Sequence, residues 1–145
     1  MKQEIKKAVY GGIVGTVVMT AMTMYIAPLM TGMPMDIAEM LGGMIGGYAM
    51  GMIAHIIMGV VVFPLAYVLL VYVFQPSSRF LSGLIFGVAL WAAAVLVVMP
   101  MAGAGMFMVN IGGAMAVMAS LMGHLVYGGL LGGIAGVRSA SFIND

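Results

Sequence analysis

The protein has 145 residues, of which 64% are hydrophobic and only 6% charged, and its mean hydropathy is +1.21. Soluble domains are about half apolar and about a quarter charged, so this composition excludes a water-soluble domain and indicates a chain embedded in a lipid bilayer. The net charge of +1, without a basic patch, argues against a nucleic-acid partner, and the lack of cysteine excludes disulfides and thiolate metal sites.

The first predicted element is a membrane helix over residues 8–30, preceded by Lys2, Lys6 and Lys7. A spanning helix needs roughly 20 mostly apolar residues. The basic start resembles that of a signal peptide, but the apolar run is too long and no small-residue cleavage site follows it. We therefore expect this segment to be retained as the first membrane span.

The second span is predicted within the apolar stretch 41–74, which is longer than one perpendicular helix requires. Asp36 and Glu39 have the spacing of an N-cap and an N3 residue, so this helix is expected to begin near Asp36. Its glycine-rich front is expected to lie in the membrane interface or to make the helix tilt. Pro64 is expected to loosen or kink the helix further on.

The third span is predicted over residues 81–101 and the fourth over residues 111–137. With four spans, every basic residue falls on one face of the membrane, and these residues are Lys2, Lys6, Lys7, Arg79 and Arg138. The positive-inside rule makes that face cytoplasmic. We therefore expect a multi-pass protein of the cell's inner (plasma) membrane with both termini in the cytoplasm.

The two halves of the chain share one pattern, in which Gly-x-x-x-Gly is followed by a proline and then by His-x-x-x-Gly. At offsets of 72 and then 69 residues, the matching members are Gly11, Gly15, Pro28, His55 and Gly59, and Gly83, Gly87, Pro100, His124 and Gly128. We predict an all-α membrane protein with a single domain, residues 1–145, made of two tandem two-helix hairpin repeats, about 8–75 and about 80–138. Its four transmembrane helices are expected to form a compact bundle with parallel repeats, related by an axis along the membrane normal.

His55 and His124 are the only histidines, and the repeat places them at equivalent positions on the second and fourth spans. Ionisable groups inside a membrane usually face the bundle interior and have a function. One hypothesis is that the pair ligates a b-type haem, because cofactors in bundles take ligands from facing helices. The alternatives are contact with a proton or quinone, and neutral imidazoles hydrogen-bonded to a threonine, a serine or a backbone carbonyl. Thr16, Thr20 and Thr23 share one face of the first span and are expected to bond to backbone or a neighbouring helix.

Glycines form two lines along the fourth span, one with Gly128, Gly132 and Gly136 and the other with Gly129 and Gly133. In lipid, such lines let helices approach closely. They indicate close packing inside the bundle, or a face on which another subunit or a flat cofactor docks.

Methionine is unusually frequent, with 19 residues. Met33, Met35, Met99 and Met101 flank prolines at the ends of the first and third spans, opposite the basic face. Thioether ligands favour Cu(I), so one hypothesis is a copper site formed by these four residues. The other is that methionine serves as a flexible apolar filler throughout the spans.

The segments "GGIVGTVVMTAM", "MPMAGAGMF" and "GHLVYGGLLGGIAG" together resemble a family of small four-helix prokaryotic integral membrane proteins of unknown function. The resemblance covers most of the chain. It implies the four-helix architecture, and no catalytic residue is carried over from it.

No charged residue lies within a predicted span, and the sequence has no nucleophile with a paired base, no phosphate loop and no zinc motif. We therefore expect a non-enzymatic accessory or assembly subunit of a larger respiratory or metal-dependent membrane complex. Its partners are expected to be lipid and other membrane subunits or further copies of itself. A haem-binding electron-transfer module, and a carrier or channel for a small neutral solute or Cu(I), are the alternatives.

Overall fold

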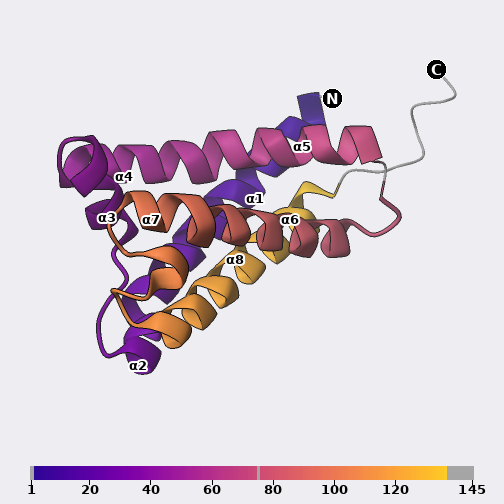
Figure 1. The fold of residues 1–145 in the computed structure, drawn as a ribbon. Helices are drawn as coiled ribbons and strands as arrows, with labels where there is room; N and C mark the ends of the chain where they lie inside the picture. Colours follow the sequence, from indigo (N-terminus) through magenta and orange to yellow (C-terminus); the bar gives the residue numbers. More distant parts are fainter. Residues whose placement is uncertain (1, 75, 137–145) are drawn as a thin grey trace, which may run out of the picture.

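The computed structural model describes residues 2–74 and 76–136, and every regular element in these ranges is helical (Figure 1). Four helices are long and apolar enough to cross a membrane, and they are Lys2–Thr31, Tyr48–Phe74, Arg79–Met101 and Gly113–Ala135. The prediction of an all-α protein with four membrane-length helices is thereby confirmed.

The first three spans are each built from consecutive helical segments with a π-helical turn between them. The first comprises α1 (Lys2–Ala21), η1 (Met22–Ile26) and α2 (Ala27–Thr31); the second α4 (Tyr48–Ile57), η2 (Met58–Val62) and α5 (Phe63–Phe74); the third α6 (Arg79–Ala93), η3 (Ala94–Val98) and α7 (Met99–Met101). A short 3₁₀ turn, η4 (Met106–Met108), lies before the fourth span, which is the single helix α8 (Gly113–Ala135).

A proline follows each π-helical turn by two residues, at Pro28, Pro64 and Pro100. Proline has no N–H to donate, and its ring clashes with the carbonyl four residues earlier. In all three spans the residue before the proline donates its N–H to the carbonyl five residues back. This wider turn relieves the clash without breaking the helix. Loosening was expected at Pro64, and the structure has it at all three prolines.

The segment before the second span forms a helix of its own, α3 (Ile37–Ile45). As expected, Asp36 is the N-cap, and its side chain accepts a hydrogen bond of 3.1 Å from the Glu39 backbone N–H. The chain then turns at Gly46 and Gly47, whose φ angles of 110° and 112° suit glycine alone. Because of this turn, α3 folds back against α4 and is a separate helix, not the tilted front of the second span. Its position in the membrane interface stays a prediction.

The start of α1 and the end of α8 lie at one end of the bundle, called the proximal end, and α2, α3 and α7 lie at the other, the distal end (Figure 1). Gly11 of α1 faces Leu131 of α8 at the proximal end, and a Cβ on Gly136 would lie 3.0 Å from the Arg79 guanidinium. Toward the distal end, α1 and α8 diverge from α4 and α5 (Figure 1). Arg138 and the predicted last residue of the fourth span, Val137, lie outside the described residues.

Glycines set the closest helix contacts. A Cβ on Gly83 of α6 would clash with the Gly128 carbonyl of α8, and a Cβ on Gly12 of α1 would lie 2.6 Å from the Gly59 carbonyl of η2. Each contact therefore requires glycine, because no other residue lets the two backbones come so near.

The buried apolar side chains form two clusters. The proximal core consists of Ala8, Met19, Tyr67, Val71, Phe86, Tyr127, Leu131 and Ala135. The distal core consists of Ala27, Met35, Val95, Met99, Ala104, Met108, Ala116 and Ala119. The interior is thus divided along the length of the bundle.

Candidate functional site

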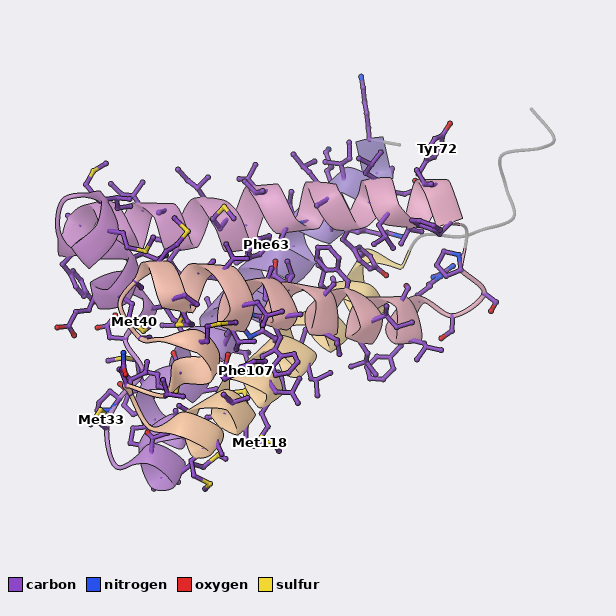
Figure 2. The ribbon with its side chains drawn as sticks, in the orientation of Figure 1. Met33, Met40, Phe63, Tyr72, Phe107 and Met118 are labelled. Carbon is purple, nitrogen blue, oxygen red and sulfur yellow. The ribbon has the colours of Figure 1, made fainter. Side chains whose placement is uncertain are left out.

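A cavity of about 230 Å³, called the central cavity, borders both cores and is lined by residues from all four spans and from α3. All three π-helical turns contribute to its wall, through Thr23, Gly59 and Ala94 among others. Figure 2 shows Phe63 and Met40 of this wall on the side of the second span and α3 that faces α6 and α7. The cavity therefore lies at the level where three of the spans depart from regular α-helix.

His55, on α4, is half-buried, and its Nε2 lies 2.9 Å from the Thr20 hydroxyl of α1. The same hydroxyl donates its only hydrogen to the Thr16 carbonyl, at 2.8 Å. Thr20 must then accept from His55, so the imidazole carries its proton on Nε2 and keeps Nδ1 as an acceptor. The expectation that the threonines of the first span bond to backbone or to a neighbouring helix holds for Thr20 and Thr23, but not for Thr16, whose hydroxyl makes no hydrogen bond among the described residues.

His124, on α8, is 92% buried, and its Nδ1 lies 2.8 Å from the Ser120 carbonyl one turn earlier in the same helix. A carbonyl oxygen only accepts hydrogen bonds, so Nδ1 is the protonated nitrogen and Nε2 keeps its lone pair. Both histidines line the central cavity, and one ring nitrogen of each makes no hydrogen bond among the described residues. The two rings thus hold opposite tautomers.

This arrangement matches the hydrogen-bonded alternative to haem ligation. The cavity volume of about 230 Å³ is smaller than the roughly 300–1,000 Å³ of sites for drug-sized ligands. The Nε2 of His55 is engaged by Thr20, whereas the Nε2 of His124 makes no hydrogen bond among the described residues. Ligation of haem b by His55 and His124 stays a prediction.

One side-chain nitrogen or oxygen atom in the described part of the chain is buried without a hydrogen-bond partner, the hydroxyl oxygen of Thr16. Thr16 lines the cavity and lies against Gly59, where a Cβ would clash with that oxygen. A buried hydroxyl without a hydrogen bond costs on the order of 1–3 kcal/mol. Such a group is a candidate contact for whatever occupies the cavity.

The structure separates the four methionines of the predicted copper site into two pairs. Met35 and Met99 are buried in the distal core and line the central cavity. Met33 and Met101 are 55% and 68% exposed, and neither lines it (Figure 2 labels Met33). The cavity brings other methionines to its wall instead, which sequence spacing did not indicate: Met19, Met40, Met58 and Met108.

The glycine lines of the fourth span face mainly into the bundle. A Cβ on Gly132 would lie 2.5 Å from the Arg79 carbonyl, and one on Gly129 would lie 3.1 Å from the Phe80 ring, both on α6. Gly128 and Gly136 also meet α6. Only Gly133, of these five, is exposed with open space beside it, since a Cβ there would have no other atom within 4 Å.

Aromatic side chains close the cavity on the proximal side. The Tyr127 hydroxyl donates a 2.6 Å hydrogen bond to the Gly59 carbonyl, and its ring meets Phe63 edge-on with centroids 6.1 Å apart. Beyond them, the Tyr67 hydroxyl bonds to Ser82, at 2.8 Å, and its ring packs edge-on against Phe86. These contacts tie the second span to α6 and α8, so the central cavity does not continue through the proximal core.

A second hollow, the side cavity, has a volume of about 150 Å³ and adjoins the first. It shares Thr23, Ile37 and His55 with the central cavity and also contains Asp36 and Tyr48. His55 therefore stands between an acidic distal hollow and the central cavity.

The histidines were found from the sequence, but most of their surroundings were not. Ser120 was not singled out, because a serine four residues before a histidine in an apolar helix has no distinctive signal. Tyr127 was likewise missed, since only the fold brings it to the cavity wall. No group of three or more histidine, aspartate or glutamate side chains able to hold a metal ion occurs in residues 2–74 and 76–136.

Comparison with known proteins identifies the family of the chain. No curated protein and no solved structure is significantly similar to it. A model described as "Family of unknown function (DUF6789)" matches residues 2–141, in agreement with the resemblance carried by the glycine and methionine motifs. Because this match covers nearly the whole sequence, the chain belongs to the DUF6789 family.

Proposed function

We propose that this protein is a non-enzymatic membrane carrier that takes a small ligand into the central cavity. The observation that carries the proposal is a cavity lined by all four spans and closed on the proximal side by Tyr127 and Phe63. Membrane carriers place their binding sites near the middle of the bilayer, between structural repeats and beside interrupted helices. The cavity lies beside the π-helical turns of three spans, and such turns often occur at functional sites. This favours a carrier over an electron-transfer module.

The proposal also includes the two tandem hairpin repeats and the orientation of the bundle in the membrane. Gly12 of α1 meets Gly59 of η2, and Gly83 of α6 meets Gly128 of α8, so both hairpins use a glycine contact just after the histidine. These contacts support two tandem repeats, with a shift of one residue from the alignment that pairs Gly11 with Gly83. We also propose that the proximal end faces the cytoplasm, because it carries the lysines and Arg79.

The reactivity of single introduced cysteines tests the carrier proposal. The sequence has no cysteine, so single substitutions report on one site each. Ala94→Cys places a thiol at the cavity wall, and a small membrane-impermeant thiosulfonate reagent is expected to modify it from the distal side of intact cells. The reaction needs water at the thiol, which a cavity open to solvent provides.

Two matched variants give the controls. Leu96→Cys lies on the same helical turn but is 45% exposed and does not line the cavity, so we expect it to face lipid and to react slowly. Ala116→Cys lies in the distal core at 0% exposure and is expected to be protected. Equal, slow reaction of Ala94→Cys and Leu96→Cys would show that solvent does not reach the cavity and would contradict the carrier.

The accessory subunit is a second candidate, favoured by Gly133, which is exposed on α8 with open space around it. In mild detergent, such a subunit should migrate with larger proteins, and Gly133→Leu should release it. Gly132→Leu is unsuitable for this test because Gly132 faces α6 of the same chain. Migration of the protein alone, unchanged by Gly133→Leu, would count against this candidate.

A further inference from the structure

The donor atoms around the central cavity are mostly soft. Its wall contains no carboxylate, lysine or arginine among the described residues, and six methionines and two histidines supply the sulfur and nitrogen donors: Met19, Met35, Met40, Met58, Met99, Met108, His55 and His124. Hard cations such as Mg²⁺ and Ca²⁺ require several oxygen ligands, including carboxylates. Thioether and imidazole together are the ligand types that suit copper, and thioethers select Cu(I).

Both imidazoles are prepared as ligands. The Nδ1–H of His124 donates to the Ser120 carbonyl and the Nε2–H of His55 donates to Thr20. A metal-binding histidine typically donates its other ring N–H to a carbonyl or similar acceptor, which fixes the ring and the tautomer. The remaining nitrogen of each ring, Nε2 of His124 and Nδ1 of His55, has no hydrogen bond among the described residues.

The buried sulfurs at the distal end of the cavity are held in place by the backbone. Met108 has a φ of 56°, a left-handed conformation that methionine seldom adopts, and its side chain is 0% exposed. Such strain persists where the surrounding structure imposes it, and it concentrates at binding sites. Met35 is anchored by a 3.0 Å hydrogen bond from its N–H to the Thr23 carbonyl. Met99 completes the distal group, next to the η3 turn.

The side cavity lies beside these donors and includes an acidic residue in its lining. Asp36 places a carboxylate in it, and His55 separates it from the central cavity. A carboxylate in a recess with low-dielectric walls raises the local concentration of cations. The ion would leave this acidic hollow for a cavity that offers it only soft ligands and hydroxyls.

We propose that the ligand of the central cavity is a Cu(I) ion, bound by the free Nε2 of His124 and by the sulfurs of Met35, Met99 and Met108, a set of four donors that suits tetrahedral Cu(I). This assignment rests on the proposed carrier function. Binding forms metal–nitrogen and metal–sulfur bonds without a change in oxidation state, so it needs no other reactant. Neutral ligands leave the ion with its single positive charge, so binding releases no proton.

The test is anaerobic titration of the purified full-length protein with Cu(I) in the presence of a competing chromogenic Cu(I) chelator. We expect one ion per chain. Met99→Leu, Met108→Leu and His124→Gln are each expected to weaken binding at least about tenfold. Leucine nearly preserves the volume of methionine and is usually tolerated in a core, so the methionine variants are expected to fold.

Met33→Leu and Met101→Leu are the matched controls, because these exposed methionines lie at the same end of the protein but outside the cavity. They are expected to leave the affinity unchanged. X-ray absorption of the copper-loaded protein is expected to show sulfur and nitrogen neighbours, and Ag(I) is expected to compete. No stoichiometric binding, or equal losses in the control and cavity variants, would overturn the assignment.

The two proposals fail separately. A reactive Ala94→Cys together with no Cu(I) binding would overturn the copper assignment and leave the carrier standing. An unreactive Ala94→Cys would overturn the carrier, while the Cu(I) titration of the cavity and control variants would still decide the copper assignment.

Discussion

At the scale of single residues, hydrogen-bonding rules in an apolar medium explain the contacts of the two histidines. An unpaired polar group in the bilayer interior is costly, so each imidazole makes a hydrogen bond to a nearby hydroxyl or carbonyl group. His124 uses the Ser120 carbonyl of its own helix, whereas His55 uses Thr20 of α1. The His55–Thr20 bond connects two spans, whereas the His124–Ser120 bond lies within one helix. Only the hydrogen bond of His55 therefore contributes to helix–helix packing.

The tautomers give a prediction at this scale. ¹⁵N NMR of ring-labelled histidine is expected to show His55 protonated at Nε2 and His124 at Nδ1. Thr20→Val is expected to change only the His55 signals and to lower the free energy of unfolding by about 0.6–2 kcal/mol, the range for hydrogen bonds between membrane helices.

Thr23→Val is the control, because the Thr23 hydroxyl donates only to the Thr20 carbonyl within the first span. This variant is expected to leave the ¹⁵N signals of both histidine rings unchanged. The same tautomer at both histidines, or a response of His124 to Thr20→Val, would contradict the assignment.

At the scale of helices, glycine and proline determine how the spans pack and where they bend. The α6–α8 contact depends on Gly83 and Gly128, whose backbones meet without side chains between them. Pro28, Pro64 and Pro100 each follow a π-helical turn. All three turns contribute residues to the wall of the central cavity. The glycines thus let the helices pack closely in the proximal half of the bundle, and the turns before the prolines form part of the cavity wall.

Two glycines of α8 provide the prediction at this scale. Gly128→Ala places a Cβ against the Gly83 carbonyl, so we expect a loss of about 1–3 kcal/mol in the free energy of unfolding. Gly133→Ala adds a methyl group where no atom lies within 4 Å, so we expect a gain of about 0.5–1 kcal/mol from helix propensity. Unfolding in mixed detergent micelles measures both, and equal effects would contradict the packing.

At the scale of the whole molecule, the charged residues of the described ranges lie near the two ends, and the interior is divided into two cores. Lys2, Lys6, Lys7 and Arg79 lie at the proximal end, and Asp36 lies at the distal end. The proximal core is sealed by aromatic contacts, while the distal half contains the central cavity. This asymmetry gives the two faces of the bundle different roles, with access expected from the distal face.

Topology is the prediction at this scale. Fluorescent-protein fusions at either terminus are expected to be fluorescent, as they are only in the cytoplasm. Met33→Cys, at a 55% exposed distal position, is expected to react with an impermeant thiol reagent added outside cells. Protection of Met33→Cys, with a terminal cysteine labelled from outside, would reverse the orientation.

The sequence by itself determined the fold class, the four spans, the Asp36 cap and the family, because these follow from local hydropathy, spacing and short motifs. It also identified the two histidines, since polar residues stand out in an apolar span. Only the tertiary structure decided which methionines line the cavity: Met35 and Met99 point inward, whereas Met33 and Met101, two residues away in each case, are exposed. It also decided that α3 folds back on α4 and that Gly132 faces α6 while Gly133 faces outward. These outcomes depend on the rotation of each helix about its axis, and nearly uniform hydrophobicity around a membrane helix leaves that rotation to be set by contacts with its neighbours.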